Sequence, residues 1–236
     1  MAGSERRSPG RRSGFSAREQ TYFPMTELRF ETAHYLVRPL TKEDISVAWA
    51  SWLLDPTTAH LLNTPSRRLS RRDLEAYVEQ FDNRDKIILG IFHRPSGTHI
   101  GIVTLIVSQG GHDVLANIIV GDDNFRSVGG MVELKAIRTA IHNDFLITKG
   151  FRSVFASVVA HNTRMIAYLK LSGWELVRRT MSRRSTTGEA VELLLFRLTR
   201  ENYIRREGKS WASLRSPEPL KGGCADNGAR PDKLSR

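Results

Sequence analysis

The feature that most constrains this 236-residue chain is a repeated change in the spacing of its apolar residues. Alternating or continuous short apolar segments predict strands, whereas apolar residues three and four positions apart predict helices. The predicted strands are 34–40, 86–93, 99–107, 114–120, 153–159, 174–182 and 190–199, and the predicted helices are 41–55, 70–81, 131–147 and 163–172. A group of strands, then strands alternating with two helices, then a hairpin is typical of one mixed α/β (α+β) sheet with helices on both faces.

Local residues fix several of the predicted element ends. Thr41 and Ser70 stand where the hydroxyl of a capping residue accepts a hydrogen bond from the first helical turn. Gly150 follows the helix predicted at 131–147, and a glycine just past a helix end favours the left-handed turn that stops it. Thr187 and Gly188 are predicted to connect the last two strands as a hairpin.

The net charge of +11 is concentrated toward the two ends of the chain. Residues 1–24 hold five Arg and two Glu, and residues 208–236 hold six Lys or Arg and three acidic residues, so these segments carry more than half of the excess. Both are rich in Ser, Gly, Pro and Arg without periodic apolar residues, which predicts disorder. We therefore expect one globular domain at 25–207 between disordered basic tails at 1–24 and 208–236.

Composition excludes several classes of protein. Cys224 is the only cysteine, so the chain has no intrachain disulfide and no thiolate cluster for zinc or iron. The seven His form no pair at ligand spacing on a predicted helix, so we expect no metal. No apolar run approaches the ~18–20 residues that a membrane helix needs. We expect a cytoplasmic protein without membrane contact.

The segment 118–137, IIVGDDNFRSVGGMVELKAI, places Gly129 and Gly130 between a predicted strand and a predicted helix. The pair can simply form a turn. Alternatively, its bare N–H groups at the positive end of a helix can hold a phosphate. The three-glycine spacing of a dinucleotide-binding fold and the Lys-Ser/Thr pair of a P-loop are both missing. What remains is a phosphate site of another kind.

That loop and five other segments resemble the GCN5-related N-acetyltransferases (GNAT). Arg126, Gly129 and Gly130 match the family's pyrophosphate-binding pattern, although Met131 occupies its last small position. The other segments are similar to a branch that contains ribosomal-protein N-terminal acetyltransferases and amino-sugar N-acetyltransferases. They are YLVRPLTKEDI, WLLDP, HIGIVTL, AHNTRMIAYLKLSGW and VELLLFRLTREN, and the resemblance covers roughly residues 27–203.

The resemblance implies a mostly antiparallel sheet of about six to seven strands, whose two central parallel strands splay apart. It also implies acetyl-CoA as the co-substrate. The pyrophosphate would lie on the loop formed by Arg126, Ser127, Val128, Gly129, Gly130 and Met131. The backbone near Ile119 and Val120 would pair with the pantetheine arm, and Asn162 would hydrogen-bond it. An ordinary helix cap is a second role for Asn162, and the two are compatible.

Candidates for acid–base chemistry are few. Many family members carry a tyrosine acid at the position of Leu169, and Tyr168 is its neighbour, about 100° around the helix. The position of the family's general base corresponds to Leu115, and Asp113 and Asn117 share its face of the strand. We expect Asp113 to be a solvated turn residue. We expect Asn117 to orient the acceptor or a water, and Tyr168 is the second catalytic candidate, although packing is its commoner role.

The resulting hypothesis is an acyl-CoA-dependent N-acyltransferase that transfers acetyl to a protein N-terminus, an amino sugar or a small amine, without a metal. One alternative is an acyl-CoA-binding protein of the same fold that has lost its chemistry. Another is a basic nucleic-acid-binding module, which the location of charge in the tails disfavours. Arg178, Arg179, Arg183 and Arg184 form either a solvated ribbon or a contact for an anionic acceptor. Relatives in this branch are often dimers, so a homodimer is also an expectation.

Overall fold

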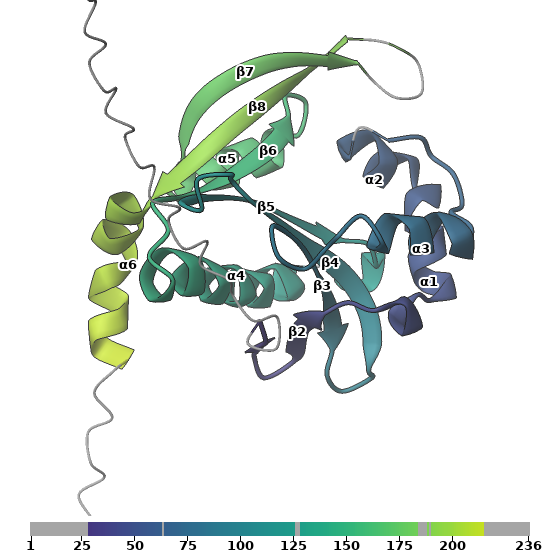
Figure 1. Cartoon of the computed structure of the whole chain (residues 1–236), viewed down its shortest axis with the longest axis horizontal. Helices are drawn as coiled ribbons and strands as arrows, with labels where there is room; N and C mark the ends of the chain where they lie inside the picture. The colour runs from purple at the N-terminus through teal and green to yellow at the C-terminus, as the bar shows by residue number, and fades with distance from the viewer. Residues whose placement is uncertain (1–27, 63, 126–127, 184–187, 189, 215–236) are drawn as a thin grey trace, which may run out of the picture.

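Eight strands form one mixed sheet in the order β1-β2-β3-β4-β5-β6-β8-β7 (Figure 1). The computed structural model describes residues 28–214 except 63, 126–127, 184–187 and 189, and it leaves undescribed the side chains of 123, 128–134 and 208–214. The strands are β1 (Phe30–Glu31), β2 (Tyr35–Pro39), β3 (Lys86–His93), β4 (Thr98–Val107), β5 (Asp113–Val120), β6 (Ser153–Val159), β7 (Glu175–Arg183) and β8 (Ala190–Thr199). The predicted strands are confirmed, and the two-residue β1 is one strand more than the predicted six to seven.

Strands β5 and β6 pair in parallel, and the other neighbouring strands pair antiparallel. The predicted hairpin of β7 and β8 is confirmed, and it curves away from the rest of the molecule in Figure 1. Gly188 has φ +69°, as a tight connection favours, and Thr187 lies outside the described residues. β7 is the edge strand, and most of its side chains are exposed.

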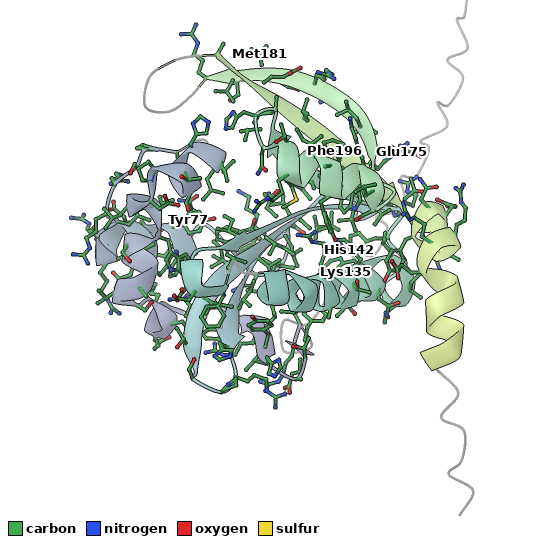
Figure 2. All side chains as sticks on the ribbon, turned by 180° about the vertical axis from the view of Figure 1, so that it is seen from behind. Tyr77, Lys135, His142, Glu175, Met181 and Phe196 are labelled. Atoms are coloured by element: carbon green, nitrogen blue, oxygen red, sulfur yellow. The ribbon has the colours of Figure 1, made fainter. Side chains whose placement is uncertain are left out.

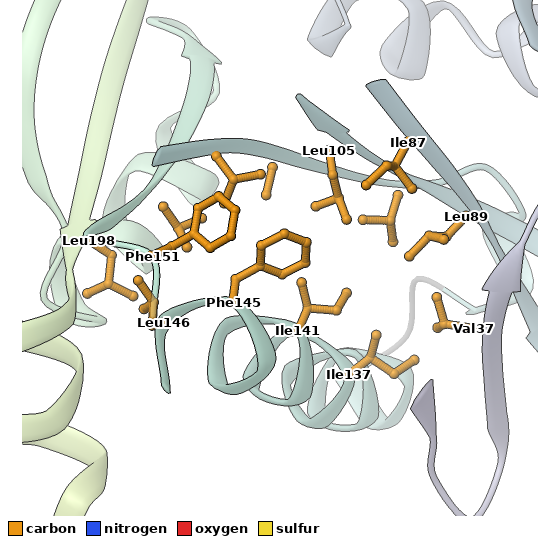
Figure 3. Packing of buried hydrophobic residues seen from close by; sticks show 14 of the residues in the cluster. Val37, Ile87, Leu89, Leu105, Ile137, Ile141, Phe145, Leu146, Phe151 and Leu198 are labelled. Carbon is orange, nitrogen blue, oxygen red and sulfur yellow. The ribbon is translucent and has the colours of Figure 1, made fainter. Parts of the chain in front are cut away.

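One face of the sheet is covered by α4 (Val128–Asn143), its π-helical continuation (Asp144–Thr148) and α5 (Thr163–Leu171). We call it the α4 face. Ile137, Ile141 and Phe145 are each 1 % exposed or less and form an apolar stripe along α4 and its continuation, which packs on the sheet in Figure 3. Phe145 meets Phe151 edge to face at 5.2 Å between ring centroids, so this face carries the main core.

The opposite face, here the α3 face, is covered by α1 (Val47–Ser51) and α3 (Arg71–Val78) over β3 and β4. In Figure 1, β3 and β4 run between these helices and α4. The Ser70 hydroxyl accepts a hydrogen bond from the Asp73 N–H at 3.1 Å, which confirms Ser70 as the cap of α3. Two separate groups of helices therefore cover the two faces, as predicted.

The prediction of one continuous helix over 41–55 is wrong. The segment folds as a 3₁₀ turn at Lys42–Asp44, then α1, a second 3₁₀ turn at Trp52–Leu54, and α2 (Pro56–Leu61). The Ser46 hydroxyl accepts from the Trp49 N–H at 3.1 Å and starts α1 afresh. The Asp55 carboxylate caps α2, whose first residue is Pro56. Caps inside the segment thus divide it, and tertiary packing sets each short helix.

Close backbone approach explains two glycines near the end of β5. A Cβ on Gly121 would lie 1.8 Å from the Trp52 ring, and one on Gly101 would lie 2.4 Å from the carbonyl oxygen of Ile119. Any side chain at either position would push β5 away from its neighbours. The glycines therefore hold the end of β5 tightly against β4 and Trp52.

The chain ends in α6 (Arg200–Leu214) beside the main core. Tyr203 is 5 % exposed, and its hydroxyl donates a hydrogen bond to the Thr139 carbonyl of α4 at 3.2 Å. The helix continues seven residues past 207, where we expected the domain to end. The buried residues of the two clusters lie between Leu28 and Tyr203, within the predicted domain.

Candidate active site

The two central strands separate partway along their length, which confirms the expected splay. β5 and β6 pair at Asp113–Leu115 with Ser153–Phe155, and their pairing ends there. Beyond that point β5 stays paired with β4 as far as Val120, and β6 stays paired with β8 as far as Val159. Each half of the sheet keeps its own neighbours, so a gap opens between the strands.

A cavity of about 420 Å³ occupies this gap. From the α4 face it is lined by Ile141 and His142 of α4 and by Met165 and Leu169 of α5. From the α3 face it is lined by Tyr77 of α3 and by the end of α2. The cavity is therefore lined from both faces of the sheet, and its size is that of a small-ligand site.

Three neutral polar side chains gather on the α3 face just beyond the last paired residues. Asn117 and Thr104 lie opposite each other on β5 and β4, and both line the cavity. Ser157 of β6 lines it from the other side of the gap. An amide and two hydroxyls can donate and accept hydrogen bonds. Asn117 is thus in the cavity, as predicted.

Tyr77 extends this polar group from α3. Its ring packs edge to face on Trp49 and Phe81, with centroids 6.5 Å and 5.3 Å away. Burial raises the pKa of the Tyr77 phenol above its ordinary value, so the hydroxyl stays protonated and can donate at neutral pH. Figure 2 labels Tyr77 on α3 and His142 on α4, from which the two side chains line the cavity.

The predicted phosphate loop lies at the start of α4. That helix begins at Val128, three residues earlier than predicted, so Gly129 and Gly130 are in its first turn. The first N–H groups of a helix have no partner within it and lie at the positive end of its dipole. Arg126 and Ser127 lie outside the described residues, and the side chains of Val128 and Met131 are not described.

The residues that we expect to contact the pantetheine arm lie on β5 and at the start of α5. Ile119 lines the cavity beyond the last paired residue, and Val120 lies opposite Gly101 of β4. Asn162 also lines the cavity, and its side-chain oxygen accepts from the Met165 N–H at 3.1 Å. The cap role of Asn162 is confirmed, and its amide NH₂ remains as a donor at the cavity.

Tyr168, the second predicted catalytic residue, does not line this cavity. It lies on a smaller cavity of about 130 Å³ between α4, α5 and α6, and the Arg138 guanidinium carbon is 4.4 Å from its ring centroid. Leu169, 2 % exposed, takes the place on the main cavity because one helical step of about 100° turns Tyr168 away. The structure thus gives Tyr168 a packing role against Arg138.

Arg138 lines both cavities and is the only charged residue among the described ones that line the larger. His142 lies beside it, and burial, followed by the charge of Arg138, lowers the pKa of His142 to about 3. His142 is therefore neutral at physiological pH. Leu115 lies at the base of the gap opposite Phe155, and Asp113 lies farther from the opening.

Sequence reasoning missed Tyr77, Thr104, Ser157 and Arg138. Thr104 stands out as a hydroxyl within an otherwise apolar strand, which could have indicated it. Tyr77 belongs to the apolar side of its helix, and Ser157 and Arg138 are ordinary residues in strand and helix patterns. Their meeting depends on the strand register, which single-chain patterns do not reveal.

The exposed arginines of β7 lie elsewhere. Arg179 pairs with Glu192 at 3.0 Å, and Arg178 and Arg183 are exposed on the same strand. None of these three lines the cavity, and Arg184 lies outside the described residues.

Within the described ranges, no group of three or more His, Cys, Asp or Glu could hold a metal ion. No helix in that part of the chain is long and apolar enough to cross a membrane.

Comparison with protein-family models gives no match, and neither does comparison with the sequences of curated proteins. Solved structures do match. A GCN5-related N-acetyltransferase from Brucella melitensis superposes with a TM-score of 0.62 at 14 % identity, over 83 % of this chain and 89 % of that one. The chain therefore has the fold of these enzymes.

Two further solved structures are also similar to this chain. One is a ribosomal-protein acetyltransferase, and the other is an acetyltransferase that acts on a polyamine. The ribosomal-protein-S5-alanine acetyltransferase from Vibrio fischeri has a TM-score of 0.59 at 14 % identity, covering 75 % of this chain and 99 % of that one. The spermidine N-acetyltransferase from Vibrio cholerae, in complex with CoA and spermine, has a TM-score of 0.59 at 14 % identity, covering 73 % and 99 %. At these identities the likeness concerns the fold.

Proposed function

Because the chain has the fold of the GCN5-related N-acetyltransferases, we propose that it is an acyl-CoA-dependent N-acyltransferase acting on a primary amine. The observation that carries the proposal is the cavity between β5 and β6, which is lined by residues from both faces of the sheet. A donor on one face and an acceptor on the other can then meet inside the sheet. Acetyl is the acyl group that we expect.

The donor fits the α4 face. The N–H groups of Gly129 and Gly130 in the first turn of α4 suit a pyrophosphate, since they lie at the positive end of the helix dipole and glycine itself carries no side chain. Beyond Leu115 the pairing of β5 with β6 ends, and the extended pantetheine arm would run along β5 near Ile119 and Val120. Asn162 adds an amide donor across the gap. CoA bound in one similar structure supports this choice of donor.

The acceptor fits the α3 face. Asn117, Thr104, Ser157 and the protonated Tyr77 can hold an amine and a water there by neutral hydrogen bonds. The amine nitrogen attacks the thioester carbonyl carbon, a C–N bond forms, and the C–S bond breaks with its electron pair on sulfur. The ammonium proton leaves to a water that Asn117 orients. Positioning of two reactants is a large part of the rate enhancement in such a reaction.

The acceptor can be a protein N-terminus, an amino sugar or a small amine. No Asp or Glu occurs among the described residues that line the cavity. A polyamine would bring further positive charges without a carboxylate there to pair with, and burying an unpaired charge is costly. This lining supports an acceptor whose groups near the reacting amine are uncharged.

The single cysteine of the sequence supports a cytoplasmic location.

Calorimetric titration of acetyl-CoA into the full chain, followed by a screen of amine acceptors, tests the proposal. We expect binding by the wild type and its loss in Gly129→Asp, because a carboxylate there repels the pyrophosphate. Asn117→Ala should bind acetyl-CoA as the wild type does but have a kcat lowered about 10- to 1,000-fold. Binding without turnover on any amine would favour the silent acyl-CoA-binding alternative. No binding at all would contradict the proposed function.

A further inference from the structure

The main cavity has no acid at the position where the family resemblance places one. Leu169 is there, 2 % exposed, and its side chain can neither donate a proton nor stabilise a charge. Breaking the thioester leaves an electron pair and a negative charge on sulfur. A group that stabilises this charge in a site of low dielectric contributes to the rate. The described lining offers one cation that can do so, Arg138.

We infer that the Arg138 guanidinium stabilises the departing CoA thiolate. It takes over the role of a hydroxyl acid, which this chain lacks because position 169 holds Leu169. The inference rests on the proposed function. As the amine nitrogen bonds to carbon and the C–S bond breaks, the electron pair stays on sulfur beside the guanidinium. Because an Arg keeps its proton, the thiolate leaves as an ion pair and takes its own proton later from water.

The position of Arg138 along α4 fits a sulfur rather than a phosphate. It follows Val128, the first residue of the helix, by ten positions. Gly129 and Gly130, whose amides suit a pyrophosphate, precede it by nine and eight positions, which at about 1.5 Å per residue is about 12–14 Å along the helix axis. An extended pantetheine arm is long enough to cover that distance. The first turn of α4 and Arg138 farther along the helix can thus serve the two ends of the same donor.

Arg138 lies where the two cavities adjoin, and its guanidinium contacts Tyr168. The Tyr168 ring lies under the guanidinium at 4.4 Å, a distance at which a cation is attracted to a ring face. The neighbouring imidazole of His142 is 6 % exposed and packs edge to face on Trp174 at 5.4 Å between ring centroids. Being neutral, His142 does not compete for a negative charge. Tyr168, chosen from the sequence as an acid, thereby becomes a positioning residue for Arg138.

Lys135 provides a matched control on the same helix. It lies one turn before Arg138 and lines the smaller cavity but not the larger (Figure 2 labels it on α4). Its removal lowers the positive charge of this region equally. A general electrostatic effect would therefore appear in Lys135→Gln as well as in Arg138→Gln, whereas a contact with sulfur would appear only in the latter.

The first measurement is the pKa of the bound CoA thiol, followed through the ultraviolet absorbance of its thiolate. It requires binding but no turnover. We expect the thiol pKa in the wild-type complex to lie about 1 below its value in the Arg138→Gln complex, with Lys135→Gln like the wild type. Equal values in the wild type and Arg138→Gln would overturn the inference while leaving the proposed function intact. Failure of the wild type to bind CoA would overturn both.

The second measurement is turnover with acetyl-CoA and with acetyl-pantetheine, which has no phosphates. Arg138→Gln should lower kcat about 10- to 100-fold with either donor, with little change in KM and partial recovery in Arg138→Lys. A higher KM for acetyl-CoA alone, with no defect on acetyl-pantetheine, would mean that Arg138 binds a phosphate and would refute the inference. Unchanged thermal unfolding of each variant shows that the effect is local.

Discussion

At the scale of single residues, the site depends on which buried side chains stay uncharged. His99 and His142 are both buried, and burial lowers their pKa values to about 4 and about 3. His99 lies among aromatic rings, with the Phe92 ring stacked at 5.0 Å, and its Nε2 lies 2.9 Å from the Gly101 carbonyl oxygen. Neutral imidazoles pack here as aromatic groups. Because His142 is neutral, Arg138 is the one charged side chain among the described residues that line the main cavity.

The buried histidines predict a dependence of stability on pH. Unfolded histidine has a pKa of about 6.5, so below that pH the unfolded chain binds protons that the folded chain does not. The buried histidines should therefore not lower the free energy of unfolding above about pH 7. Below that pH the free energy of unfolding should fall by up to about 1.4 kcal/mol per pH unit for each buried histidine. Denaturant unfolding of the wild type at pH 7, 6 and 5 measures this slope.

His142→Phe keeps a ring against Trp174 but removes the titrating group. We expect its slope between pH 6 and 5 to be smaller than that of the wild type by about one proton, or about 1.4 kcal/mol per pH unit. His112→Gln, at an exposed position in the turn before β5, serves as the control. A slope in His142→Phe equal to that of the wild type would show that the folded state protonates His142 readily.

At the scale of elements, the ends of β5, α4 and α5 meet around one gap. The first turn of α4 follows β5, and Asn162 at the start of α5 follows β6. Parallel neighbouring strands place these helix starts at the same edge of the sheet. The helix cap and the proposed donor contact of Asn162 can therefore belong to one side chain, through its oxygen and its NH₂ group respectively.

Two substitutions of Asn162 separate these roles. Asn162→Asp keeps an oxygen that caps α5 but loses the NH₂ donor, so stability should be retained while the Kd of acetyl-CoA rises. Asn162→Ala loses both, with a stability loss of about 1 kcal/mol. Thermal unfolding and calorimetry measure the two effects. Wild-type affinity for acetyl-CoA in Asn162→Asp would leave Asn162 as a cap alone.

At the scale of the whole molecule, the sheet consists of two halves joined by a short parallel contact. The contact is three residues long on each strand, and the first buried cluster extends across it from Leu28 to Tyr203. The core on the α4 face therefore joins the two halves. We propose that residues 25–214 are sufficient for folding and for binding acetyl-CoA.

Truncation tests this domain assignment. A chain of residues 25–214 should unfold at the temperature of the full chain and bind acetyl-CoA equally well. Further truncation at residue 199 removes α6 with the buried Tyr203 and should lower the unfolding temperature by about 5–10 °C. Equal thermal stability of the two truncated chains would show that α6 is dispensable. Salt-dependent RNA binding by residues 25–214 would instead revive the nucleic-acid alternative.

Local patterns accounted for most of the elements in this protein. The strands and the apolar stripe of α4 follow from residue spacing, and the caps Ser70 and Asn162 follow from side chains adjacent to the helices they begin. The predicted helix at 41–55 failed because Ser46 and Asp55 each restart the chain, and spacing alone gives no weight to a second cap. Short-range patterns predict whether a segment is a helix or a strand. They predict less well the residues at which the helix or strand is interrupted.

The sequence by itself determined the elements, their buried faces and, through its resemblance, the family of folds and the choice of Asn117. Only the tertiary structure decided that Asn117 meets Thr104, Ser157 and Tyr77, and that Leu169 rather than Tyr168 lines the cavity with Arg138. The reason is that helical and strand periods are properties of neighbours along the chain. The composition of a cavity depends on strand register and helix rotation, which are set by packing between distant segments.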